Sequence, residues 1–100
     1  MYIILASKDN QYRSEVVDGL RAVEKYDYYF YDQKRAEFVI AEVMSPTTRV
    51  KIVSAGEPED VNYVPVKIFE SFEDIDEARS ELESLISFGH LKTELRRVEQ

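Results

Sequence analysis

The segment 12–26, YRSEVVDGLRAVEKY, decides which fold the chain adopts, because it can be interpreted as a helix or as a β-hairpin. On a helical wheel its apolar residues share one side: Tyr12, Val16, Leu20, Val23 and Tyr26. Against a helix, Asp18-Gly19 is a two-residue hairpin signal, and a glycine inside a helix costs about 1 kcal/mol relative to alanine. Because apolar and polar residues alternate poorly over 12–17, the pattern favours the helix, and the hairpin stays open as the alternative.

The segments on either side of it are predicted strands. The continuous apolar run 2–6 is typical of a central strand buried on both faces. Further β-rich runs occur at residues 28–31, 37–43, 49–53 and 63–69, and polar turns or loops separate them. Pro65 cannot donate a hydrogen bond to a neighbouring strand, so the last of these runs is expected at an edge or a bulge.

A second helix is predicted from residue 71 onward. Ser71 with Asp74, or Asp74 with Glu77, has the spacing of a capping box. The apolar stripe has the spacing of a helix that packs on a core: Phe72, Ile75, Ala78, Leu82, Leu85 and Ile86. Gly89 is placed to end the helix.

These elements predict a two-layer α+β domain in the order βαββ(β)βα. We expect an antiparallel, partly mixed sheet of 4–5 strands with two helices packed on one face. Residues 1–89 form this single domain, and residues 90–100 form a C-terminal amphipathic tail. The other face of the sheet is expected to stay open unless the tail or a partner covers it.

Composition excludes several classes of function. Thirteen basic and twenty acidic side chains give a net charge of −7, which disfavours direct binding to nucleic acid or to an anionic membrane. The chain has no cysteine, only one histidine and no recognised catalytic motif, so we expect no enzymatic activity, no cofactor and no metal site. No segment has the length and apolar character of a membrane span or signal peptide, and a cytoplasmic location is expected.

The acidic residues are concentrated in one segment. Residues 57–83 contain ten acidic and two basic side chains. The predicted protein-binding residues on the second helix are Glu73, Asp74, Asp76, Glu77 and Glu81. A plainer interpretation is that acidic residues in the first turn of a helix are stabilised by the helix dipole.

Aromatic residues form a second unusual run, from Tyr26 to Tyr31. Successive strand residues point to opposite faces, so Tyr29 and Tyr31 are predicted on a displayed face, where tyrosines make good interface anchors. We therefore expect a small acidic, non-enzymatic protein-binding module, regulatory or inhibitory, whose partner has a basic surface. The alternatives are an anionic mimic of nucleic acid, and a small enzyme or ligand-binding domain with no recognisable motif.

The tail supplies a candidate surface for oligomerisation. Its apolar stripe is Phe88, Leu91, Leu95 and Val98, flanked by Lys92, Arg96 and Arg97. This stripe is expected to form a homodimer contact, to fold back on its own sheet, or to stay undocked.

Overall fold

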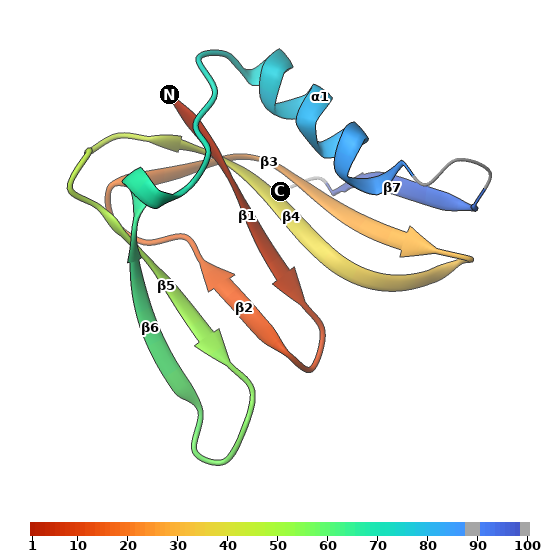
Figure 1. Ribbon diagram of the computed structural model, residues 1–100, viewed down its shortest axis with the longest axis horizontal. Coiled ribbons are helices and arrows are strands. Elements are labelled where there is room, and N and C mark those ends of the chain that lie inside the picture. The colour runs from red at the N-terminus through yellow and green to blue at the C-terminus, as the bar shows by residue number, and fades with distance from the viewer. Residues whose placement is uncertain (88–90, 99–100) are drawn as a thin grey trace.

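The computed structural model describes residues 1–87 and 91–98 (Figure 1). These residues form one seven-stranded antiparallel sheet, one α-helix and one 3-10 turn, η1. The elements are β1 (Tyr2–Lys8), β2 (Tyr12–Glu15), β3 (Leu20–Phe30), β4 (Gln33–Val43), β5 (Arg49–Ser54), β6 (Asp60–Pro65), η1 (Val66–Ile68), α1 (Ile75–Ile86) and β7 (Thr93–Val98). The strand order is β6-β5-β2-β1-β4-β3-β7, and β6, which ends in Pro65, is an edge strand.

The centre of the sheet is formed by β1 and β4, which pair antiparallel with Ile3 opposite Ala41 and Leu5 opposite Val39. Alternate residues of β1 enter two different cores, as its continuous apolar sequence predicted. The first core is formed by Ile3, Leu5, Leu20, Ala41, Val50 and Val66. The second core, on the opposite face, lies under α1 and is formed by Ile40, Phe72, Ala78 and Leu82.

The second core takes further half-buried side chains from β1, β3, β4 and β7, namely Tyr2, Ile4, Tyr26, Phe38 and Leu95. Helix α1 therefore crosses one face of the sheet, as Figure 1 shows. The central strands are covered on both faces. The expectation of one wholly open face is therefore wrong, and uncovered sheet is found toward the ends of the strands.

The predicted fold of two helices on a sheet of 4–5 strands is also wrong. Segment 12–26 forms β2, a turn and the first part of β3, so the favoured helix is wrong. The alternative hairpin is not formed either, because β2 pairs with β1 and β5, whereas β3 pairs with β4 and β7. Gly19 adopts a φ of +94°, and a Cβ there would lie 2.0 Å from Oγ1 of Thr48. The backbone carbonyl of Gly19 also accepts a hydrogen bond from the Met44 N–H at 2.7 Å. This position therefore requires glycine in a turn, not in a helix.

A β-bulge explains why the same segment resembles a helix. The register of β3 against β4 shifts between Ala22 and Glu24. An extra residue in a strand reverses the alternation of side chains beyond it. Leu20 consequently lies in the first core, whereas Tyr26 packs against the second. Because the alternation is interrupted, the apolar residues of the segment lie three or four positions apart, as expected of a helix.

The C-terminal tail contains the seventh strand. β7 pairs antiparallel with β3, from Lys25 opposite Val98 to Phe30 opposite Thr93. Leu95 packs against the second core, Val98 is half-buried and Leu91 is exposed. Phe88 and Gly89, for which a homodimer contact and a helix end were predicted, lie outside the described residues.

Candidate functional site

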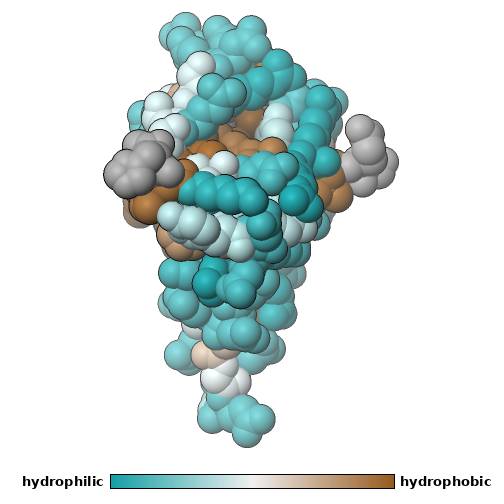
Figure 2. Space-filling model, turned by 90° about the vertical axis from the view of Figure 1, so that its right-hand side faces the viewer, coloured by the Kyte–Doolittle hydropathy of each residue, from teal (hydrophilic) through white to brown (hydrophobic). Residues whose placement is uncertain are grey.

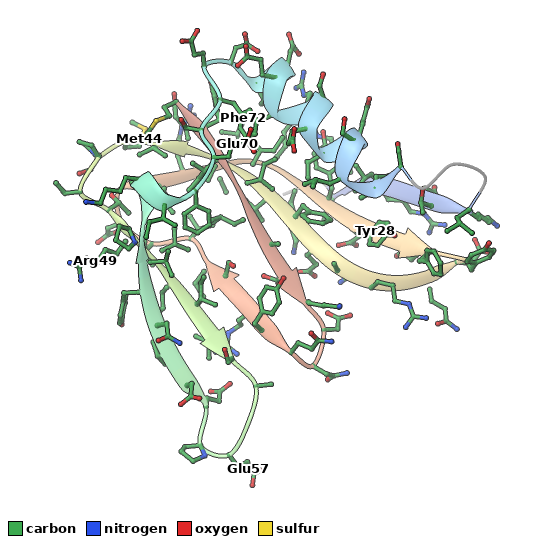
Figure 3. The ribbon with its side chains drawn as sticks, in the orientation of Figure 1. Tyr28, Met44, Arg49, Glu57, Glu70 and Phe72 are labelled. Atoms are coloured by element: carbon green, nitrogen blue, oxygen red, sulfur yellow. The ribbon has the colours of Figure 1, made fainter. Side chains whose placement is uncertain are left out.

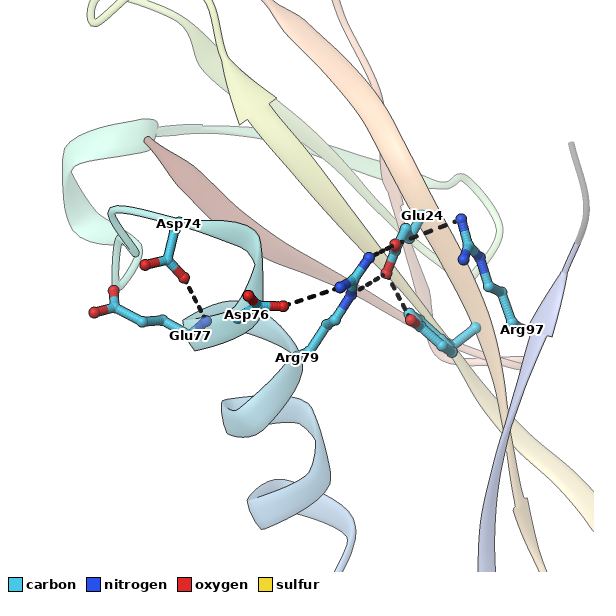
Figure 4. Close-up of polar contacts among 7 residues, drawn as sticks. Glu24, Asp74, Asp76, Glu77, Arg79 and Arg97 are labelled. Atoms are coloured by element: carbon cyan, nitrogen blue, oxygen red, sulfur yellow. Dashed lines mark hydrogen bonds and ion pairs between the residues drawn. The ribbon is translucent and has the colours of Figure 1, made fainter.

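Three of the five predicted acidic residues have partners within the first turn of α1. Asp74 is the N-cap, and its Oδ1 accepts a hydrogen bond from the Glu77 N–H at 2.9 Å. Oε2 of Glu77 accepts from the Glu73 N–H at 3.1 Å. Asp76 lies 3.0 Å from Nη1 of Arg79 (Figure 4). The spacing Asp74–Glu77 thus begins the helix, as the capping signal predicted, and the side chain of Glu73 is exposed.

The fifth acidic residue, Glu81, lines a cleft of 220 Å³ together with Glu70. The other side chains of this acidic cleft are apolar: Ile4, Ala6, Phe38, Phe69, Phe72 and Leu85. Leu85 is 51% exposed. Within residues 1–87 and 91–98, neither the Glu70 nor the Glu81 carboxylate makes an ion pair. Figure 3 shows Glu70 beside Phe72, in the segment that leads into α1.

The two predicted tyrosines differ in their surroundings. The ring of Tyr29 is half-buried, and the guanidinium carbon of Arg96 on β7 lies 4.1 Å from its centroid. Tyr31 is 51% exposed and sits in the β3–β4 turn with a φ of +50°. Its ring meets Phe30 edge-on, with 4.7 Å between centroids. Tyr31 is therefore displayed, whereas Tyr29 is partly covered by the tail.

A larger cleft lies on the same face of the sheet as α1. This aromatic cleft has a volume of 600 Å³ and is lined by Tyr12, Tyr28, Phe30 and Phe38, with Lys8, Gln11 and Arg35 among its polar side chains. Ala6 and Phe38 line both clefts, so the two adjoin. We call the two adjoining clefts together the face groove. In the view of Figure 2, hydrophobic surface is gathered in the upper half of the molecule, and the lower half is almost entirely hydrophilic.

Sequence reasoning did not identify the aromatic cleft. Tyr28 and Phe30 carry the period-2 signal of one strand face, which was visible in the sequence. Tyr12 joins them only because segment 12–15 is a strand, and Phe38 only through the pairing of β3 with β4. The centroid of the Phe38 ring lies 6.3 Å from that of the Tyr28 ring, and the angle between the ring planes is 61°.

Glu24 is a buried charged residue beside α1, only 3% exposed. Its carboxylate accepts hydrogen bonds from Nε of Arg79 at 3.0 Å, from Nη2 of Arg79 and from the Tyr26 hydroxyl at 2.6 Å. Arg97 of β7 approaches to 3.4 Å (Figure 4). The hydrogen bonds from Arg79 lower the pKa of Glu24 to about 2, and burial opposes this. Burial is the main cause of the raised pKa of Tyr26. This fully paired cluster joins β3, α1 and β7.

Comparisons with protein-family models, with curated proteins and with solved structures find no match. Among the described residues, no group of three or more histidine, cysteine, aspartate or glutamate side chains is arranged to hold a metal ion. Likewise, within residues 1–87 and 91–98, no helix has the length and apolar character needed to cross a membrane. The candidate functional site is the face groove.

Proposed function

We propose that the protein is a non-enzymatic protein-binding module that engages the basic surface of a partner through the acidic cleft. The observation that supports this most directly is the combination of Glu70 and Glu81 with exposed apolar surface at Leu85. A lysine or arginine of a partner could place its charged end on the carboxylates and its aliphatic stem on the apolar floor. The proposed action is regulatory or inhibitory, and the proposed setting is the cytoplasm.

The surrounding charge supports the same partner. Glu73, Asp74, Asp76 and Glu77 lie in the segment that leads into the acidic cleft and in the first turn of α1. Capping uses some of their oxygen atoms but does not remove their charge. An acidic surface of this kind speeds the approach of a basic protein, most strongly at low ionic strength.

The salt dependence of binding separates this proposal from an anionic mimic of nucleic acid. In the acidic cleft, apolar contacts at Leu85 would contribute to the affinity, and salt screens them little. A mimic that used only carboxylates would lose affinity steeply between about 50 and 200 mM salt. The proposed module should therefore retain most of its affinity over that range.

The test is affinity capture of partners with a charge-matched pair of variants. We expect wild-type protein to retain a basic partner that the double variant Glu70→Lys, Glu81→Lys does not retain. The control is Glu57→Lys with Asp60→Lys, which makes the same change in net charge at the far tip of the β5–β6 hairpin (Figure 3). Equal retention by both double variants would show that the acidic cleft is not the binding surface.

A further inference from the structure

The aromatic cleft has the size and lining of a ligand site. Its volume of 600 Å³ is in the range of small-molecule and side-chain pockets, which is about 300–1,000 Å³. Four aromatic rings line it, and the rings of Tyr28 and Phe38 already meet edge to face. Aromatic side chains prefer such neighbours, and each well-placed pair contributes about 0.5–1.5 kcal/mol beyond the area that it buries. The cleft therefore offers room and matching contacts for another ring.

The charged side chains that line this cleft are basic, although the chain as a whole is acidic. Nine of the thirteen basic side chains make an ion pair within the described residues. The four without one in that part of the chain are Lys8, Arg35, Arg49 and Lys67. Two of these four, Lys8 and Arg35, line the aromatic cleft. In a chain of net charge −7, these two exposed cations, which make no ion pair within the described residues, offer a contact for anions.

We propose that the aromatic cleft binds an acidic peptide segment that carries an aromatic side chain. The ring of the ligand packs among Tyr12, Tyr28 and Phe30, and its flanking carboxylates contact Lys8 and Arg35. This rests on the proposed function and deepens it. The partner meets the face groove with a basic part at Glu70 and Glu81 and with an acidic, aromatic part at the other end.

Charge complementarity favours such a peptide over a single-stranded nucleic acid. Stacked bases and phosphates would also suit aromatic rings and cations. A nucleic acid strand that continued along the groove would bring phosphates to the carboxylates of Glu70 and Glu81, which would repel them. A peptide can change its charge along its length, as the groove does.

The test is an NMR titration of the full chain with three capped pentapeptides of defined sequence. The probes are Asp-Asp-Trp-Asp-Asp, Lys-Lys-Trp-Lys-Lys and Asp-Asp-Ala-Asp-Asp. We expect saturable shifts at the amides of Tyr12, Tyr28 and Ala36 with the first peptide. Affinity for the other two should be at least about tenfold lower, because each lacks one of the two matching features.

Matched variants assign the binding to the two cations. Lys8→Glu with Arg35→Glu should lower the affinity for the acidic tryptophan peptide at least about tenfold. Arg49→Glu with Lys67→Glu makes the same charge change and removes the other two cations without a partner among the described residues. It should leave the affinity nearly unchanged, since Arg49 lies on the opposite side of the molecule from Tyr28 in the view of Figure 3.

Four results would overturn the inference. They are equal binding of the lysine peptide, an equal loss of affinity in both double variants, no saturable shift at millimolar concentrations of the acidic tryptophan peptide, and tighter binding of an oligothymidine strand at the same amides. The last result would assign the cleft to nucleic acid. None of them depends on Glu70 or Glu81, so this inference and the proposed function can fail separately.

Discussion

The carboxylate of Glu24 on β3 and the guanidinium of Arg79 on α1 are joined by two hydrogen bonds across 55 positions of sequence. Glu24 is buried and Arg79 is partly exposed, so the pair fixes α1 on the sheet at the border of the second core. Arg97 on β7 completes the contact. One carboxylate thus holds the helix and the last strand on the same part of β3.

Replacement of Glu24 by glutamine should destabilise the fold. Glutamine keeps the shape but removes the charge, so Arg79 and Arg97 lose their common partner. Breaking a fully buried ion pair typically costs about 3–5 kcal/mol, and the partial exposure of both arginines places this pair at the lower end of that range. Urea unfolding measures the free energy. The control is Glu42→Gln, which breaks the exposed pair with Arg21 and should cost far less. Similar losses in both variants would contradict a special role for Glu24.

Stability should decrease in acid because of the same residue. The folded pKa of Glu24 is about 2 and the ordinary value is 4.5, so the folded state favours the ionised form. This contribution, about 3 kcal/mol, is fully present above the ordinary pKa and is lost as the pH falls toward the folded pKa. The free energy of unfolding of wild type should therefore fall more between pH 4.5 and pH 2 than that of Glu24→Gln. Parallel pH profiles would rule this out.

Two leucines of α1 should respond very differently to truncation. Leu82 is 1% exposed in the second core, whereas Leu85 is 51% exposed beside the acidic cleft. Leu82→Ala should cost about 2–5 kcal/mol, and Leu85→Ala less than about 1 kcal/mol. Thermal and urea unfolding compare the two on the same helix. An unchanged melting temperature for Leu82→Ala would mean that α1 does not pack as described.

Gly19 should not tolerate alanine. A Cβ at this position would meet the side chain of Thr48, and the positive φ disfavours any residue with a Cβ by about 1–2 kcal/mol. Gly19→Ala should therefore destabilise the protein by more than this amount. The double variant Gly19→Ala, Thr48→Ala should recover the part that is due to the clash. No recovery in urea unfolding would assign the whole loss to backbone strain.

Sequence patterns predicted the elements that depend on neighbouring residues. The apolar run of β1 and the Asp74–Glu77 cap of α1 are local signals, and both correspond to structure. Segment 12–26 was misassigned because the bulge between Ala22 and Glu24 breaks the alternation that identifies a strand. The apolar stripe of the tail, with its residues three or four positions apart, did not indicate a strand, and it is the pairing with β3 that makes residues 93–98 one.

The candidate site was harder to predict than the fold. The face groove combines side chains from β1, β2, β3, β4, the segment before α1 and α1 itself, and no spacing along the chain relates them. The negative charge of segment 57–83 was visible in the sequence, and from it Glu81 was predicted as a binding residue. The same charge also led to the prediction of Asp74 and Glu77, whose side-chain oxygens accept hydrogen bonds at the start of the helix. Lys8 and Arg35, the two cations of the aromatic cleft, were not predicted as site residues, because the net charge of the chain is negative.

Ala6 and Phe38 line both clefts of the face groove, and this sharing has a consequence for affinity. A ligand anchored at one end would hold its remainder close to the other, so the second contact would form as an intramolecular step at high effective concentration. Two weak attachments could then add up to a long-lived complex. Cutting such a ligand into halves would weaken its binding far more than the loss of either half suggests.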